Sequence, residues 1–245
     1  MKHAYLSELA GKPLVSYLAK AGYNINFIRQ NNYVDPRIST HADLFMCQFG
    51  LWDEAALFFG DPEKLGSDYP KDIIYNAVCT RDYFVHSINY TDPFMMQSMM
   101  MWHESMSYED GISELGRVAD VRQGYSRCMC LPVDDRSFIT SDEGIAAALE
   151  AQFASVLKIR PGSILLPGFE YGFIGGCAGH IYIDNLEDPS GPPQRAIIFN
   201  GDLSRHPDFE RIADFIRSRN IHPVYFENYT LEDIGSILSM EGRGL

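Results

Sequence analysis

The chain holds His41 and Asp43 two positions apart, just before the apolar run of residues 44–47. We expect this segment to form a strand, on which side chains two apart point to the same side of the sheet. A carboxylate can hold a guanidinium group through two hydrogen bonds, and histidine is the usual proton carrier near neutral pH. The pair therefore indicates a site for a cation beside a proton-transfer group. The alternative is a His–Asp pair that only stabilises the end of a strand.

A second group of candidates lies in residues 123–128, which read Gln-Gly-Tyr-Ser-Arg-Cys and are expected to join a strand to the next hairpin. The glycine in this segment lets the backbone approach a ligand closely. Gln123 and Tyr125, on either side of that glycine, are therefore candidate substrate-binding residues.

Cys128 and Cys130 are expected to share one face of a strand over residues 128–133. Cys128 is a candidate nucleophile, because a thiol needs a base or a positive neighbour to ionise and Arg127 precedes it. The alternative is a small apolar residue in a core strand, which is the favoured role for Cys130. The Cys-x-Cys spacing is not that of a zinc site and no second ligand pair is evident, so the sequence predicts no metal and no cofactor.

The most unusual segment is residues 168–180, which contains five glycines among 13 residues, interleaved with aromatic residues. It lacks the Gly-Lys-Ser/Thr sequence of a phosphate-binding loop. Glu170 and Phe173 are candidate substrate-binding residues, and Cys177 with His180 offers a second thiol–imidazole pair. The alternative is a tightly packed loop at the axis of a ring, where crowding requires small residues.

The chain has 245 residues, with 20 Lys and Arg against 33 Asp and Glu, and a formal net charge of −13. An apolar content of 46% excludes a disordered chain. A general nucleic-acid-binding protein is also excluded, because phosphate contacts require clustered basic residues. Many of the acids, such as Asp134, Asp135 and Asp142, lie on expected turns and helix starts. Asp43, Glu170 and Asp202 are the acids placed in motifs that could meet a cation, although Asp202 follows Asn-Gly and a turn is the alternative there.

Five cysteines in a chain of this length do not resemble a disulfide framework. The first ten residues include Lys2, His3 and Glu8 and have no apolar run, and no segment approaches the roughly 20 apolar residues that span a bilayer. We therefore expect a cytoplasmic protein with no membrane partner. No linker divides the chain, so a single domain over residues 1–245 is expected.

A methionine-rich helix is expected over residues 93–106, which hold six of the ten methionines. Met95, Met99 and Met106, together with Trp102, form one helical face that is typical of a core contact. The remaining methionines broaden the apolar surface. They leave room for a contact with a second copy of the chain in a homodimer.

The expected elements repeat in the order strand, strand, helix, strand. In the clearest copy, two short apolar runs flank the turn Asp-Asp-Arg, and apolar residues at helical spacing then precede a third run. The alternative is a generic α/β chain, in which strands and helices alternate without a repeat. The three regular copies cover residues 73–122, 128–162 and 173–226.

The two ends of the chain fit the same pattern. Residues 13–21 predict a helix and residues 25–29 a strand, without a preceding hairpin, and residues 234–240 predict a C-terminal strand. Together they can form one unit whose parts come from opposite ends of the chain. Such a unit would close a ring, as radially repeated folds require. Residues 37–60 would begin a further, less regular unit.

Several motifs stand out along the chain: "VRQGYSRC", "ITSDEGI", "LPGFEYGFIGG", "FNGD" followed by "HPD", and "DIGSI". They resemble a family of bacterial proteins of unknown function that is assigned to the guanidino-group-modifying-enzyme fold, also called the pentein fold. The resemblance covers about residues 25–238 of the chain. It implies an α/β fold in which five units form a five-bladed α/β propeller with pseudo-fivefold symmetry, each built from strand, strand, helix and strand.

The wider superfamily includes deiminases, dimethylargininase-like hydrolases and amidinotransferases. Its enzymes use a cysteine nucleophile, a histidine base and acids that hold the guanidinium group at the propeller axis. His41-Ala42-Asp43 is similar to their His-x-Asp strand. Their catalytic cysteine follows glycines near the C-terminus, whereas residues 235–240 here read Gly-Ser-Ile-Leu-Ser-Met. The resemblance therefore requires a replacement nucleophile, for which Cys128, Cys177 and Cys47 are the candidates.

Three functional hypotheses follow. The first is a hydrolase or transferase that acts on a small cationic guanidino or amidino compound through a cysteine nucleophile, with His41 as the proton carrier. It predicts a thiol within direct or water-mediated reach of His41. The second is a non-catalytic binding protein of the pentein fold that has lost the C-terminal cysteine. The third is metal-dependent hydrolysis by a cluster of His, Asp and Cys.

Overall fold

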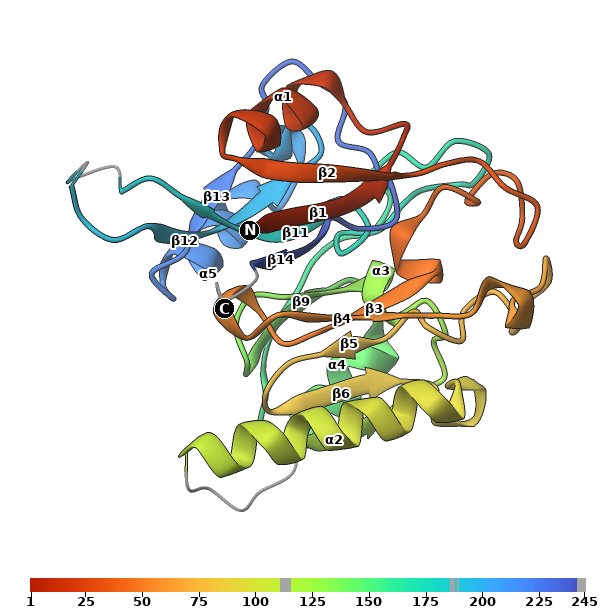
Figure 1. Cartoon of the computed structure of the whole chain (residues 1–245). Coiled ribbons are helices and arrows are strands. Elements are labelled where there is room, and N and C mark those ends of the chain that lie inside the picture. Colours follow the sequence, from red (N-terminus) through yellow and green to blue (C-terminus); the bar gives the residue numbers. More distant parts are fainter. Residues whose placement is uncertain (111–115, 186–187, 189, 242–245) are drawn as a thin grey trace.

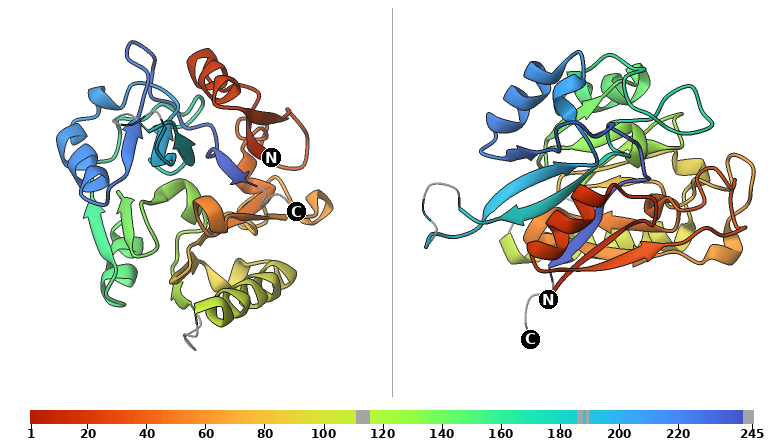
Figure 2. Two further views of the ribbon diagram at one scale, coloured as in Figure 1. Left: turned by 60° about the vertical axis from the view of Figure 1, so that its left-hand side comes forward. Right: turned by 90° about the horizontal axis from the view of Figure 1, so that it is seen from above.

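The computed structural model describes residues 1–110, 116–185, 188 and 190–241. It shows a mixed α/β protein whose strands form four small sheets (Figure 1). The left view of Figure 2 shows α1 (Lys12–Lys20, red), α2 (Pro93–Asp110, yellow-green) and α5 (Phe209–Arg217, blue) at the periphery. None of the helices in the described ranges combines the length and apolar character that crossing a bilayer requires.

One unit follows the expected order closely. Strand β8 (Cys130–Pro132) pairs antiparallel with β9 (Ser137–Thr140), and β9 pairs parallel with β10 (Ser155–Lys158). Helix α4 (Glu143–Glu150) connects the two parallel strands and buries Ile145, Ala146 and Leu149. Asp142 caps this helix, because its Oδ1 accepts a 2.7 Å hydrogen bond from the backbone N–H of Ile145.

Two further units have the same order and the same pairing, so the predicted repeat is confirmed in all three regular copies. In each, the first two strands are antiparallel and a helix leads to a third strand parallel to the second. The first contains β5 (Val78–Cys79), β6 (Tyr83–His86), α2 and β7 (Arg117–Asp120). The second contains β11 (Ala178–Ile183), β12 (Gln194–Phe199), α5 and β13 (His222–Val224).

The two ends of the chain form a fourth unit of this kind, which confirms the predicted join. Strand β14 (Leu238–Glu241) pairs antiparallel with β1 (Lys2–Ser7), and β1 pairs parallel with β2 (Tyr23–Ile28) across α1. The expectation that the N-terminus lacks a strand before its helix is wrong. The polar residues Lys2 and His3 at the start of β1 interrupt the apolar pattern from which a strand is predicted. The strand nevertheless buries Ala4 and Leu6 completely.

The less regular segment, residues 37–60, contributes a hairpin and short 3₁₀ helices but no α-helix. Strand β3 (Met46–Phe49) pairs antiparallel with β4 (Ala56–Phe59) and parallel with β5, so the sheet has the order β4-β3-β5-β6-β7. Beside this sheet, α2 buries Met95 and Met99, as its apolar face predicts. Its Met100 and Met101 are exposed. The homodimer contact stays a prediction.

Two local expectations near the candidate site are wrong. Residues 42–44 form the 3₁₀ helix η1 (Ala42–Leu44), not a strand, and β3 begins only at Met46. Residues 126–129 form a single helical turn, α3 (Ser126–Met129), so Cys128 and Cys130 do not share one face of a strand. Both segments are shaped by hydrogen bonds to distant parts of the chain, which short-range sequence patterns do not report.

Candidate functional site

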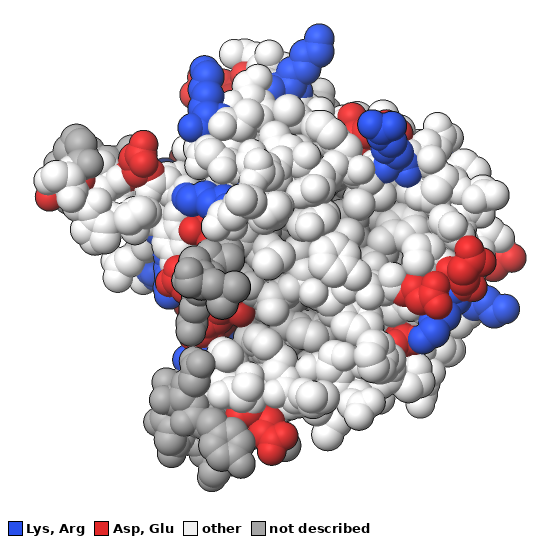
Figure 3. All heavy atoms as spheres, in the orientation of Figure 1, with Lys and Arg blue, Asp and Glu red and all other residues white. Residues whose placement is uncertain are grey.

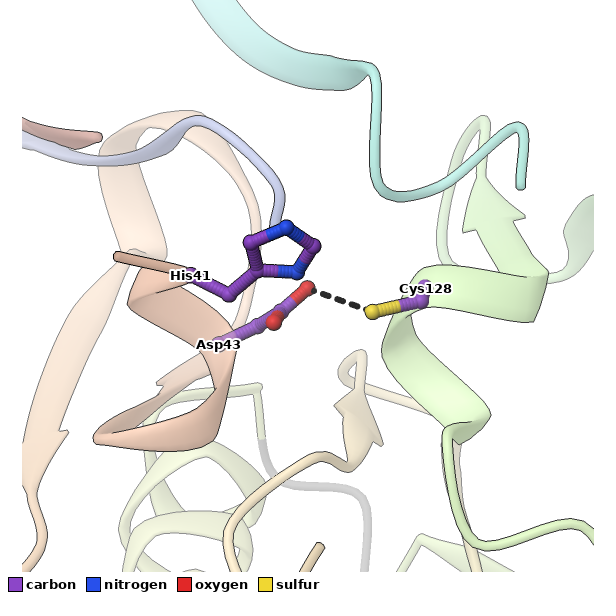
Figure 4. A group of neighbouring side chains, drawn as sticks. All are labelled: His41, Asp43 and Cys128. Carbon is purple, nitrogen blue, oxygen red and sulfur yellow. Dashed lines mark hydrogen bonds between the residues drawn. The ribbon is translucent and has the colours of Figure 1, made fainter. Parts of the chain in front are cut away.

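Three of the predicted residues meet in one buried cluster. His41 immediately precedes η1, Asp43 lies within it, and Cys128 lies in α3. The Cys128 thiol donates a 3.0 Å hydrogen bond to Oδ2 of Asp43. One potential ligand atom from each of the three side chains lies within 4.8 Å of the other two, and all three residues are buried. Figure 4 shows the imidazole of His41 beside the Asp43 carboxylate, with Cys128 facing it from α3.

The C-terminal segment holds η1 in place. The backbone N–H of Asp43 donates a 3.1 Å hydrogen bond to the carbonyl oxygen of Gly235. Gly235 has a φ of +72°, and a Cβ at this position would lie 2.1 Å from Cβ of His41. Only glycine satisfies both the left-handed backbone and this close approach. The position of the His41 side chain therefore depends on Gly235.

Asn76 connects α3 with η1. Its Oδ1 accepts a 2.8 Å hydrogen bond from the backbone N–H of Arg127. Its Nδ2 donates to the carbonyl oxygen of Asp43 at 3.3 Å and to Sγ of Cys128 at 3.4 Å. Asn76 is fully buried. One amide group thus fixes the turn that presents Cys128 and the segment that presents Asp43.

Ser236 and Asp233 complete the cluster. The hydroxyl of Ser236, a residue with a φ of +68°, donates a 2.5 Å hydrogen bond to Oδ2 of Asp43. The Asp233 carboxylate accepts hydrogen bonds of 3.0 Å from the backbone N–H groups of Phe173 and Gly235. Its Oδ1 lies 4.0 Å from Nδ1 of His41. The C-terminal segment therefore supplies two polar side chains that contact the predicted pair.

Burial dominates the electrostatics of the cluster. It raises the pKa of the Cys128 thiol well above its usual value, and the charge of Asp43 raises it further. Burial also raises the pKa of Asp233, which the nearby His41 partly offsets. At neutral pH Cys128 is a thiol that donates to Asp43. The other oxygen of that carboxylate, Oδ1, is buried and has no hydrogen-bond partner among the described residues.

The other candidate cysteines lie outside this hydrogen-bonded set. Cys177 is fully buried in an apolar cluster with Leu131 and Ile197, and its Sγ lies 3.3 Å from the carbonyl oxygen of Ile174. Cys47 on β3 directs its Sγ to the carbonyl oxygen of Ala77 at 3.4 Å. All five cysteines are free and buried. Of the three nucleophile candidates, Cys128 alone joins His41 and Asp43 in the described cluster.

Gln123 and Tyr125 line an open cleft of about 820 Å³ on the N-terminal side of α3. The Tyr125 hydroxyl donates a short hydrogen bond to Oδ2 of Asp72. Phe173 is half-buried and reaches the cluster through its backbone N–H, which donates to Asp233. Gln123, Tyr125 and Phe173 therefore lie around the cluster, and in the described part of the structure their side chains form no hydrogen bond with Cys128.

Glu170 and Asp202 lie together in a different place. Both line a cavity of about 310 Å³ whose lining does not include Asp43. Glu170 is exposed. Asp202 caps the 3₁₀ helix η5 (Leu203–Arg205) by accepting a hydrogen bond from the backbone N–H of Ser204, and it forms an ion pair with Arg205. The structure thus separates these two acids from Asp43.

Sequence reasoning missed Asn76, Asp233 and Ser236. The motif "DIGSI" contains the last two, but their residue types alone do not show that they contact Asp43 and His41. Asn76 carries no local signal, since its role arises from contacts with residues 33 and 52 positions away. The Cys-x-Cys spacing predicted no zinc site, and the hypothesis of a metal cluster of His, Asp and Cys did not specify its residues. The structure identifies His41, Asp43 and Cys128 as three potential ligands from separate segments.

Comparison with known proteins gives one result. A model of a family described as "Family of unknown function (DUF6873)" matches residues 52–238, which include Asn76, Cys128, Asp233 and Ser236. His41 and Asp43 precede the matched range. No curated protein and no solved structure matches the chain. Because the match covers well over half of the sequence, the chain belongs to this family of unknown function, DUF6873.

Proposed function

We propose that this protein is a hydrolase or transferase that acts on a small guanidino or amidino compound, with Cys128 as its nucleophile and His41 as its proton carrier. The observation that carries the proposal is the buried cluster in which Sγ of Cys128 lies 3.0 Å from Asp43 and within 4.8 Å of a ring nitrogen of His41. A thiol and an imidazole at this separation can exchange a proton directly or through one water.

The proposal includes a pentein fold, that is, a five-bladed α/β propeller. Its support is the repetition of one unit, with two antiparallel strands and a helix leading to a third, parallel strand, in four parts of the chain. The hairpin β3–β4 would be the core of the fifth blade. The unit built from β14, β1, α1 and β2 joins the two ends, as closure of a ring requires.

The charges in the cluster favour a cationic ligand. Two buried carboxylates, Asp43 and Asp233, lie beside His41, and the unpartnered Oδ1 of Asp43 can accept a hydrogen bond from a guanidinium group. The net charge of −13 does not gather into one acidic patch on the face in Figure 3, where charged side chains lie mostly toward the edges. We therefore base the proposed ligand selection on the buried acids Asp43 and Asp233.

The reaction can be written with all groups accounted for. Cys128 gives its proton to His41, and Sγ forms a bond to the central carbon of the guanidinium group, which Asp43 holds. One C–N bond then breaks, and the departing amine or ammonia takes the proton back from His41. Water in a hydrolase, or an acceptor amine in a transferase, then attacks the same carbon and gives a proton to His41. The C–S bond breaks and His41 returns that proton to Sγ of Cys128. Water yields a urea-type product whose surplus proton leaves with the released ammonia or amine, and an acceptor amine yields a new guanidinium compound.

The raised pKa of Cys128 is compatible with this chemistry. Without a bound cation the thiol stays protonated, because burial and the charge of Asp43 both oppose a thiolate. A guanidinium cation next to Sγ would lower the pKa of the thiol, because an opposite charge favours the ionised form. Substrate binding would therefore activate the nucleophile.

A non-catalytic binding protein of the same fold is the second candidate. Ser236 favours it, since this serine stands in the segment where superfamily enzymes carry their cysteine. In that case Asp43 and Asp233 would hold a cation without reaction at Cys128. The two candidates differ in whether bound ligand is converted.

The test is an assay of ammonia and urea-type product release from arginine, agmatine, creatine and methylated arginines, combined with calorimetric binding measurements. We expect turnover that Cys128→Ala abolishes and that Cys130→Ala preserves, since Cys130 is an equally buried thiol outside the cluster. Binding without turnover would establish the second candidate. Equal turnover in wild type and Cys128→Ala, or no binding of any guanidino compound, would overturn the proposed reaction.

A further inference from the structure

We propose that His41, Asp43 and Cys128 also form a binding site for a divalent cation that accepts nitrogen and sulfur ligands, with Zn²⁺ as the representative ion. Among the described residues, these three side chains bring an imidazole nitrogen, a carboxylate oxygen and a sulfur within 4.8 Å of one another. This donor set is one that zinc sites in proteins use. The site is distinct in chemistry from the proposed reaction, although the same side chains form it.

The spacing of the donors is close to what a tetrahedral ion needs. Ligand atoms at about 2.0–2.3 Å from zinc stand roughly 3.3–3.8 Å from one another. Sγ of Cys128 lies 3.0 Å from Oδ2 of Asp43, and the largest separation in the set is within 4.8 Å. Side-chain rotations that move each donor atom by up to about 1 Å would bring the three donors to one ion. A fourth position would remain for water.

Two of the three ligands accept a hydrogen bond from a neighbour that can orient them, and an acid lies near the third. Nδ2 of Asn76 donates to Sγ of Cys128 at 3.4 Å. The Ser236 hydroxyl donates to Oδ2 of Asp43 at 2.5 Å. Oδ1 of Asp233 lies 4.0 Å from Nδ1 of His41. Such outer contacts are typical of metal sites, where they fix the ligand orientation and contribute to affinity.

A second observation points to a cation independently of the donor set. Oδ1 of Asp43 is buried, and no donor contacts it in the described part of the structure. A buried carboxylate oxygen without a hydrogen-bond donor is costly, because its desolvation is not compensated. A cation that both oxygens of the Asp43 carboxylate contact would supply that compensation.

Metal binding and the thiol reaction would exclude each other, because both use Sγ of Cys128. A zinc-loaded protein is then inactive toward guanidino compounds, and removal of the metal restores turnover. This consequence rests on the proposed function. The binding site itself does not, since the affinity of the isolated protein for zinc can be measured without a substrate.

The test uses the full chain without a purification tag, freed of metal by a chelator and titrated with Zn²⁺ by calorimetry. We expect one equivalent to bind, with release of protons from the ligands. Cys128→Ala and Asp43→Ala should lose this binding, and Asn76→Ala should weaken it by about 10- to 100-fold. Cys130→Ala, which removes a buried thiol outside the cluster, should bind as the wild type does.

Titration with Co²⁺ gives a readout that needs no variant. Coordination by the Cys128 thiolate should produce a sulfur-to-cobalt charge-transfer band at one equivalent of metal. Absence of zinc binding by the wild type, absence of the cobalt band, or unchanged zinc affinity in a folded Cys128→Ala protein would each overturn the metal site.

The two proposals can fail separately. If the protein converts guanidino compounds but binds no zinc, the metal site alone is overturned. If it binds zinc but converts no guanidino compound, the reaction alone is overturned.

Discussion

The thiol of Cys128 donates a 3.0 Å hydrogen bond to Oδ2 of Asp43, although the two residues are 85 positions apart in the sequence. Burial is the main reason why the pKa of Cys128 is raised, and the charge of Asp43 is the next. The carboxylate therefore has two opposite effects at this site. Under the proposed function it would attract a cationic ligand, and its charge also helps to keep the Cys128 thiol protonated.

Replacement of Asp43 by Asn should make Cys128 more reactive toward iodoacetamide at neutral pH. The substitution removes a negative charge beside the thiol and so lowers its pKa, and each unit of that decrease gives about tenfold more thiolate. In the wild type the alkylation rate of Cys128 should rise as the pH rises above 8. The rate is followed by mass spectrometry of the peptide that contains Cys128.

Asp202→Asn is the matched control for this prediction, because its carboxylate caps η5 and lies outside the cluster. That variant should alkylate Cys128 at the wild-type rate. A rate in Asp43→Asn equal to or below that of the wild type would show that Asp43 does not hold the thiol in its protonated form.

Two substitutions of Ser236 should separate the contributions of its hydroxyl and of its backbone strain to the free energy of unfolding. Its φ of +68° is unfavourable for a residue other than glycine, and its hydroxyl donates to Asp43. Ser236→Ala keeps the strain and removes the hydrogen bond, so the free energy of unfolding should fall by about 1–2 kcal/mol. Ser236→Gly relieves the strain and should be up to about 1 kcal/mol more stable than the alanine variant.

Urea unfolding of the wild type and of both Ser236 variants measures these differences. An alanine variant more stable than the glycine variant would show that the left-handed backbone at this position carries no strain. An alanine variant as stable as the wild type would show that the hydroxyl contributes nothing to the buried Asp43 carboxylate.

Much of the fold could be predicted because each copy of the repeat can be recognised from short-range sequence patterns. Alternating apolar runs, turn residues and a helix with one apolar face recur in each regular unit, and such features lie within a few residues of one another. Strand β1 was missed because Lys2 and His3 mask its alternation. The join of the two ends was found because an incomplete unit stood at each terminus.

The site could be predicted only in part. His41, Asp43 and Cys128 were recognised by residue type, and the structure places them together. The strand on which the first two were expected is a 3₁₀ helix, because the backbone N–H of Asp43 bonds to Gly235, which is 192 positions further along the chain. Contacts between residues this far apart do not show in the spacing of residue types along the chain. Asn76 was missed for the same reason.

Gly235 should tolerate no side chain, whereas Gly162 should tolerate one. Both have positive φ angles, of +72° and +90°. A Cβ on Gly235 would lie 2.1 Å from Cβ of His41, while nothing lies within 4 Å of a Cβ on Gly162. Gly162→Ala should therefore cost about 1 kcal/mol for the backbone alone. Gly235→Ala should cost about 1–3 kcal/mol more, because His41 must move.

Thermal and urea unfolding of the two glycine variants measure this comparison. If Gly235→Ala folds, we also expect its zinc affinity to fall, because His41 no longer faces Asp43. Equal destabilisation in the two variants would mean that the segment around His41 can shift without a cost in free energy. The close contact between Gly235 and His41 would then have no structural role.

The stability of the protein should fall as the pH decreases from 6.5 to 4, and His86 should contribute to that fall. Burial lowers the pKa of His86 from 6.5 to about 4. Its Nε2 lies 3.1 Å from the carbonyl oxygen of Gly124 and its Nδ1 lies 2.7 Å from Oγ1 of Thr91. In this pH range the unfolded chain binds a proton at His86 that the folded chain does not bind, so acid favours unfolding.

The lowered pKa corresponds to a loss of about 3 kcal/mol between pH 6.5 and 4, on the scale of 1.36 kcal/mol per pKa unit. The free energy of unfolding in urea, measured at several pH values, should therefore rise with pH across this window. In His86→Asn the slope should decrease, because one titrating group is gone, even if the variant is less stable throughout. His222→Asn, which removes a half-buried histidine on β13, is the control. A slope in His86→Asn equal to that of the wild type would show that His86 takes up its proton equally in the folded and unfolded chains.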